Sequence, residues 1–128
     1  METTQELSAF LIPVAGTCVI AGELDATASV GLAPDLSAAV DRYLDPDKHG
    51  GVRPASIRVD LRRLKQLSTE GVALLESVVE RAARAGATTT VLVRGGSQPC
   101  RVLQAVESGR PLNLEVTSPA DRGSPPRA

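Results

Sequence analysis

Two short apolar runs near the start of the chain predict a β-hairpin. Residues 9–14 and 17–21 are almost wholly apolar, and the pair Ala15-Gly16 between them is typical of a turn. The second run leads into Gly22-Glu23-Leu24-Asp25, which we expect to end the second strand. Residues 1–8 are polar and acidic, so we place them in an N-terminal extension outside the domain.

Helical spacing of apolar positions follows from Pro34 onward. Residues 26–33 are mostly small, and proline is favoured in the first turn of a helix, so we expect the helix to begin at Pro34. Residues 45–54 contain two prolines and two adjacent glycines, which predict a loop. The apolar face of the helix is formed by Leu36, Ala39, Val40, Tyr43 and Leu44.

The middle of the chain alternates between strand and helix patterns. Residues 56–61 alternate and predict a strand with one buried side. From Ser68 to about Ala85, apolar residues recur three and four positions apart, which predicts a helix that Gly86 ends. The β-branched run 88–93 predicts the next strand.

The last segments complete an alternating α/β order. Residues 95–97 predict a turn, a short helix follows to about Glu107, and residues 112–116 predict an edge strand. Residues 117–128 contain three prolines and little apolar content, which predicts a disordered tail. The order β-β-α-β-α-β-α-β therefore predicts one α/β domain over residues 9–116, with an N-terminal hairpin and a mostly parallel sheet flanked by helices.

Composition narrows the possible partners. The net charge of −1 gives no basic surface for nucleic acid, and Phe10 and Tyr43 are the only aromatic residues, so no stacking platform is expected. The sequence also lacks an apolar run long enough to cross a bilayer, and its polar N-terminus does not resemble a secretory signal. We therefore expect a cytoplasmic protein that binds neither nucleic acid nor a membrane.

The titratable residues do not form a recognisable catalytic or metal site. The single histidine, His49, lies in a predicted loop, and no serine or cysteine stands in a nucleophile motif. Gly95-Gly96 lacks the frame of a phosphate loop, and Asp45 and Asp47 lack the other ligands of a calcium loop. We expect no enzymatic activity, no cofactor and no metal.

Two cysteines are too few for a disulfide framework and are interpreted as reduced thiols, with a regulatory disulfide as the alternative. Cys18 lies in an apolar strand and is expected to be buried. Cys100 lies near a predicted helix start, where the helix dipole favours a thiolate, so Cys100 is a candidate redox residue.

The run Ser68-Thr69-Glu70-Gly71 is the main candidate site because it opens a predicted helix. Unpaired N–H groups and the helix dipole stabilise negative charge at such a position. The plain interpretation makes Ser68 an N-cap, Glu70 a first-turn acid and Gly71 a tolerated residue within the helix.

Three short motifs resemble those of the STAS domain family and follow one another in the same order along the chain. Gly22-Glu23-Leu24-Asp25 resembles the family's GxLD signature, and Asp60-Leu61 and Gly71-Val72 match the outer parts of its second motif without a gap. The segment ending Ala33-Pro34-Asp35-Leu36 resembles the entry of the family's first helix. The resemblance covers about residues 9–116 and implies a STAS-type fold.

The resemblance implies a function in bacterial transcription regulation. Small family members are anti-sigma factor antagonists: they bind an anti-sigma factor that has a histidine-kinase-like ATPase fold, and so free a sigma factor. The kinase partner switches them off by phosphorylating the second serine of an Asp-Ser-Ser-Gly motif. The resemblance also places Asp25 near that surface, although a capping role for Asp25 is an equal alternative. We expect a monomer or weak dimer.

This chain departs from the motif at three positions. Ser68 replaces the aspartate, Thr69 the first serine, and Glu70 the serine that is phosphorylated. Glu70 would carry about one negative charge, against about −1.5 to −2 for phosphoserine, which makes it a partial mimic. Thr69 as a new acceptor is the second hypothesis. An apparent insertion also separates Asp25 from Pro34.

A third hypothesis comes from other STAS domains, which resemble scaffolds or regulatory subunits in stress-signalling or lipid-transport complexes. These roles need no phosphate cycle, and the missing acceptor serine is compatible with them.

Overall fold

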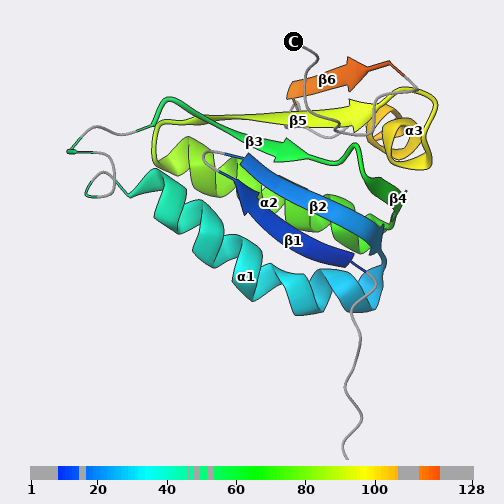
Figure 1. Cartoon of the computed structure of the whole chain (residues 1–128), viewed down its shortest axis with the longest axis horizontal. Helices are drawn as coiled ribbons and strands as arrows, with labels where there is room; N and C mark the ends of the chain where they lie inside the picture. Colours follow the sequence, from blue (N-terminus) through cyan, green and yellow to red (C-terminus); the bar gives the residue numbers. More distant parts are fainter. Residues whose placement is uncertain are drawn as a thin grey trace, which may run out of the picture.

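An N-terminal hairpin forms one end of the sheet, and the later strands are connected mostly through helices (Figure 1). The computed structural model describes residues 9–14, 17–45, 47, 50–51, 54–106 and 113–118. In chain order the elements are β1 (Ala9–Val14), β2 (Thr17–Leu24), α1 (Ala26–Leu44), β3 (Ser56–Asp60), β4 (Leu64–Leu67), α2 (Thr69–Arg84), β5 (Thr88–Arg94), α3 (Gln98–Ala105) and β6 (Asn113–Thr117).

The described strands form one mixed six-stranded sheet in the order β1-β2-β3-β5-β6, with β4 paired to β2. Only the β1–β2 pair among these is antiparallel, and the other pairings are parallel. Cys18 lies opposite Val59, Val59 opposite Val91, and Val91 opposite Leu114. The predicted α/β class and the mostly parallel sheet are therefore confirmed.

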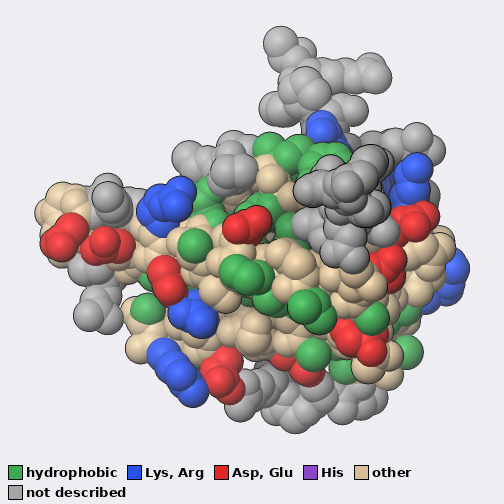
Figure 2. All heavy atoms as spheres, turned by 90° about the horizontal axis from the view of Figure 1, so that it is seen from below, with side chains coloured by type: hydrophobic (Ala, Val, Ile, Leu, Met, Phe, Trp, Pro, Cys, Tyr) green, Lys and Arg blue, Asp and Glu red, His purple; other side chains and the backbone are tan. Residues whose placement is uncertain are grey.

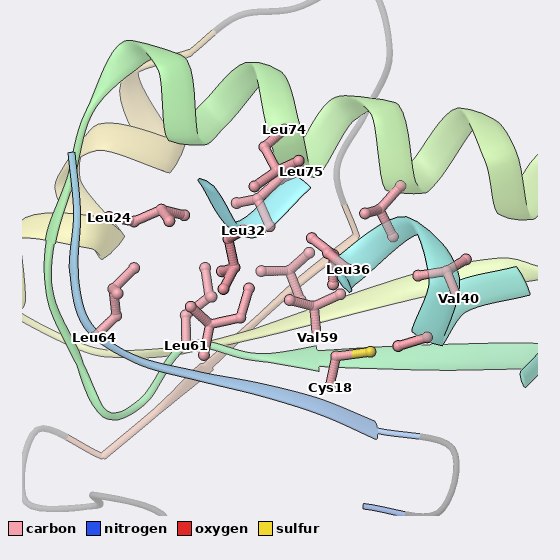
Figure 3. Packing of buried hydrophobic residues seen from close by; sticks show 14 of the residues in the cluster. Cys18, Leu24, Leu32, Leu36, Val40, Val59, Leu61, Leu64, Leu74 and Leu75 are labelled. Atoms are coloured by element: carbon pink, nitrogen blue, oxygen red, sulfur yellow. The ribbon is translucent and has the colours of Figure 1, made fainter. Parts of the chain in front are cut away.

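The hydrophobic core lies between the sheet and the helices α1 and α2. Helix α1 packs on β1, β2 and α2, while α2 also packs on β5. Figure 3 shows aliphatic side chains from both helices and from the sheet pointing into this space. The core is aliphatic, and the two aromatic residues lie at its margin: Tyr43 is partly buried and Phe10 is 55% exposed.

Figure 2 looks onto the α1 side of the molecule, where hydrophobic side chains lie scattered among acidic and basic ones. The most exposed large hydrophobic side chain of α1 is Val30, at 75%. None of the described helices combines the length and the apolar character that crossing a membrane requires.

The prediction that the first helix begins at Pro34 is wrong. Helix α1 begins at Ala26, and Asp25 is its N-cap. Pro34 lies inside the helix, exposed to solvent, and costs one backbone hydrogen bond. The helix forms nevertheless because Ala28 and Leu32 continue the buried stripe of Leu36 and Val40. The apparent insertion between Asp25 and Pro34 is thus the first two turns of α1.

The predicted element order is also incomplete, because it lacks β4. Leu64 and Leu67 are buried while Lys65 and Gln66 between them are exposed, so the strand has no two-residue alternation. Its pairing with β2, which includes a register shift between Gly22 and Glu23, defines it instead. Helix α3 ends at Ala105, two residues before its predicted end.

The remaining predicted strands and the helix from Ser68 are confirmed, but Thr117, the first residue of the predicted tail, is the last residue of β6. Helix α2 has Ser68 as its N-cap, and its other end is closed by Gly86, which has φ +82°. There the N–H of Ala87 bonds to the carbonyl of Ala82 and the N–H of Gly86 to that of Ala83, which is a Schellman motif. The predicted extension 1–8, the turn at Ala15-Gly16, His49 and most of the predicted tail lie outside the described residues.

Candidate functional site

The N-termini of α1 and α2 meet at the carboxyl edge of the parallel strands. β2 ends at Leu24 and β4 ends at Leu67, and each is followed at once by the N-cap of a helix. The backbone N–H of Ser68 donates to the carbonyl oxygen of Leu24 at 3.0 Å, and its Oγ donates to the same oxygen at 2.9 Å. The two predicted site segments, at Asp25 and at residues 68–71, are therefore brought together.

Ser68 is fully engaged in this junction. Besides donating to Leu24, its Oγ accepts a hydrogen bond from the N–H of Gly71 at 3.1 Å, which caps α2. Its backbone is extended, with φ −91° and ψ 172°, as expected for an N-cap. A phosphate on Ser68 would replace the hydroxyl proton and so remove the hydrogen bond that Oγ donates to Leu24.

Asp25 caps α1 in the same way. Its Oδ1 accepts from the N–H of Ala28 at 2.8 Å, and its carbonyl oxygen accepts from Oγ of Ser29 at 2.7 Å. The capping interpretation of Asp25 is therefore confirmed. The residue is exposed, so capping leaves it on the surface beside the start of α2.

Thr69 and Glu70 form the exposed first turn of α2. Glu70 is the second residue of the helix, where the dipole favours a negative charge. Thr69 is one position earlier, so the two side chains point about 100° apart around the helix. Both are directed to solvent at the junction, which gives the site a fixed carboxylate and a nearby hydroxyl.

Gly71 lies in a tightly packed position, which the interpretation of it as a tolerated helix residue did not include. The residue is buried, and a Cβ built on it would lie 2.7 Å from Cδ1 of Leu67 and 3.1 Å from Cδ2 of Leu24. The absence of a side chain lets the first turn of α2 approach the ends of β2 and β4 closely.

Gln98 stabilises the junction through hydrogen bonds to Leu67. The sequence patterns did not predict this role. Its Oε1 accepts from the N–H of Leu67 at 2.7 Å, and its Nε2 donates to the carbonyl of Leu67 at 3.1 Å. This pair of bonds fastens α3 to the last residue of β4, directly before Ser68. No local pattern in the sequence indicates a contact between residues so far apart.

A second missed feature is the ion pair between Asp60 and Arg62. Nε and Nη2 of Arg62 donate to the two carboxylate oxygens at 3.0 and 2.8 Å, and the N–H of Arg62 adds a bond of 3.0 Å. Burial alone would raise the pKa of Asp60, but the hydrogen bonds and charge of Arg62, with the charge of Arg63, outweigh it and lower this pKa. In the sequence, the two-residue spacing of Asp60 and Arg62 was the one pattern that could have indicated this ion pair.

The two cysteines are free thiols, and both are buried. Cys18 is 0% exposed, as predicted, and burial raises its pKa to about 11. Cys100 lies at the predicted helix start, where its N–H donates to Oγ of Ser97 at 3.2 Å, but it is only 3% exposed. Because a redox sensor needs an accessible thiol, this burial argues against the redox role predicted for Cys100.

Among the described residues, no group of three or more His, Cys, Asp or Glu side chains is placed to hold a metal ion. No protein-family model and no curated protein matches the sequence of this chain.

Proposed function

We propose that this chain is a STAS-type anti-sigma factor antagonist that regulates sigma-factor-dependent transcription by binding an anti-sigma factor with a histidine-kinase-like ATPase fold. The junction between Ser68 and Leu24 carries the proposal, because it joins two segments that resemble family motifs on one exposed edge. The α/β architecture of the described residues, which includes three helices, is compatible with the family's fold. As part of this proposal, the protein acts in the cytoplasm by binding its partner, without enzymatic activity and without a cofactor.

In this proposal Glu70 stands in place of a phosphorylated serine. Its carboxylate is exposed on the first turn of α2, where a phosphate would be directed to a partner. It supplies about one negative charge where phosphoserine supplies about −1.5 to −2. The protein then behaves as permanently phosphorylated and binds its kinase partner weakly or selectively.

The test compares the wild-type chain with Glu70→Ser for binding to the purified anti-sigma factor of the same organism. We expect Glu70→Ser to bind roughly tenfold more tightly without ATP, because a desolvated like charge or unpaired carboxylate at an interface costs about 1.4 kcal/mol or more. Glu76→Ser, on the same helix, is the matched control and should leave the affinity unchanged. Equal affinities of wild type and Glu70→Ser would refute the phospho-like role.

Thr69 is a second possible phosphate acceptor, and its exposure favours it over the engaged hydroxyl of Ser68. Incubation with the kinase partner and ATP, followed by mass spectrometry, tests this directly. A phosphate on wild type that is lost in Thr69→Val would assign the site. Absence of phosphate on both would leave Glu70 as the only source of phosphate-like charge.

The scaffold alternative rests on the same missing serine, since a subunit of a stress-signalling or lipid-transport complex needs no phosphate cycle. Co-purification from the native cell separates the two functions. Recovery of an anti-sigma factor supports the proposed antagonist, whereas recovery of a scaffold or transporter subunit in its place contradicts it.

A further inference from the structure

A pocket of about 400 Å³ opens beside β4 and is lined largely by positive side chains. Its volume lies in the range of small-molecule sites. This concentration of charge contrasts with the chain as a whole, whose net charge is −1. The lining residues are Arg62, Arg63, Leu64, Lys65 and Arg94.

The topology explains why these cations meet. β3 and β5 are adjacent parallel strands, and the N–H of Leu61 donates to the carbonyl of Leu92 at 2.8 Å at the end of their pairing. The turn after β3 supplies Arg62 and Arg63, β4 supplies Lys65, and the last residue of β5 supplies Arg94. The pocket thus lies at the carboxyl ends of parallel strands, where open α/β sheets bind their ligands.

The ion pair with Asp60 fixes one wall of the pocket. Two side-chain hydrogen bonds hold the Arg62 guanidinium against the carboxylate, and the Arg62 side chain is only 21% exposed. Asp60 pairs with Arg62, and Lys65 and Arg94 add further positive charge to the lining. None of the lining residues in the described part of the chain is acidic, so this part of the lining is predominantly positive.

From this geometry we propose that the pocket binds a diphosphate group. Arginine guanidinium groups donate charge-assisted hydrogen bonds to phosphate oxygens, and lysine adds a compact charge. Several cations around a small volume favour an anion with more than one charged centre. A nucleic acid strand is disfavoured because the pocket lining contains no aromatic side chain for base stacking.

This site is independent of the proposed antagonist function, because it uses none of the residues at the Ser68–Leu24 junction. The diphosphate has two possible sources, free inorganic pyrophosphate or the diphosphate ester of an organic molecule. Both present the same oxygens to the arginines, and the experiment separates them.

Isothermal titration calorimetry of the full chain with inorganic pyrophosphate and with ADP at low salt tests the proposal. We expect saturable one-to-one binding that weakens as salt is raised. Lys65→Ala and Arg94→Ala should each weaken binding by about tenfold, the effect typical of a lost charge-assisted hydrogen bond. Arg84→Ala removes a cation from the far end of α2 and is the matched control, with unchanged affinity expected.

Tighter binding of ADP than of pyrophosphate would identify an organic ester as the source, and equal or weaker binding would identify free pyrophosphate. No saturable heat with either ligand would overturn the proposal. Sulfate binding as tight as pyrophosphate would also overturn it, and so would an equal loss in Arg84→Ala. Because Lys65 is exposed, its variant keeps the test valid if Arg94→Ala fails to fold.

Discussion

The carbonyl oxygen of Leu24 accepts two hydrogen bonds from Ser68, one from its backbone N–H at 3.0 Å and one from its hydroxyl at 2.9 Å. This shared acceptor holds the starts of α1 and α2 together, so the candidate partner surface depends on one serine. The contribution of Ser68 to the free energy of unfolding can be measured.

Ser68→Ala should lower the free energy of unfolding by about 1–2 kcal/mol, because it removes the N-cap of α2 and the hydroxyl bond to Leu24. Urea denaturation of the two proteins gives the difference. Ser77→Ala is the control: Ser77 is exposed in the middle of α2 and bonds only to the carbonyl of Leu74, so its effect should stay within about 0.5 kcal/mol. Equal effects would show that the junction adds no stability.

Gly71→Ala should destabilise the fold by roughly 1 kcal/mol. Alanine improves helix propensity by about 1 kcal/mol, but overpacking against Leu67 and Leu24 costs about 1–3 kcal/mol. A double-mutant cycle with Leu67→Ala isolates the clash, because the added methyl group should be neutral or stabilising once the Leu67 side chain is shortened. Stabilisation by Gly71→Ala in the wild-type background would contradict the close approach.

The Asp60–Arg62 ion pair predicts a loss of stability in acid. The pKa of Asp60 is lower in the folded protein than its ordinary value, so its contribution is present at neutral pH and is lost as the pH falls through the folded pKa. Urea denaturation between pH 6 and about pH 2.5 should show a steeper decline for wild type than for Asp60→Asn. Asp41→Asn, which alters an exposed ion pair with Arg81, should decline as wild type does.

Both cysteines should resist alkylation in the folded protein. Cys18 is 0% exposed with a pKa of about 11, and Cys100 is 3% exposed. Iodoacetamide at pH 8 followed by mass spectrometry should give almost no adduct on the native chain and two adducts in urea. Rapid labelling of Cys100 on the native chain would restore its predicted redox role.

Much of the fold could be predicted from the sequence because its signals are local. The alternation of residues 56–61 and the helical stripe of α2 needed only neighbouring positions, and so did the Ser68 cap. The missed features depend on contacts between distant segments. β4 is defined by its pairing with β2, and α1 tolerates Pro34 because its buried face outweighs the lost bond.

The candidate site likewise combines features that local sequence patterns predict with contacts between distant segments that they do not. The sequence located Ser68, Thr69 and Glu70 at a helix start, which is a local property. It did not show that Gly71 is tightly packed, because the neighbouring atoms belong to Leu67 and Leu24 across the junction. Gln98 binds Leu67 across an even longer separation, which only the folded chain reveals.

The single antiparallel pair among the described strands has a consequence for folding kinetics. The β1–β2 hairpin joins neighbouring segments, whereas every parallel pairing joins strands separated by a helix or a long connection. Closing those connections costs conformational entropy before their contacts form, which slows folding relative to an all-helical domain of this size. The hairpin and the individual helices can form early, and the surface that Ser68 and Leu24 share is completed only when the distant strands have paired.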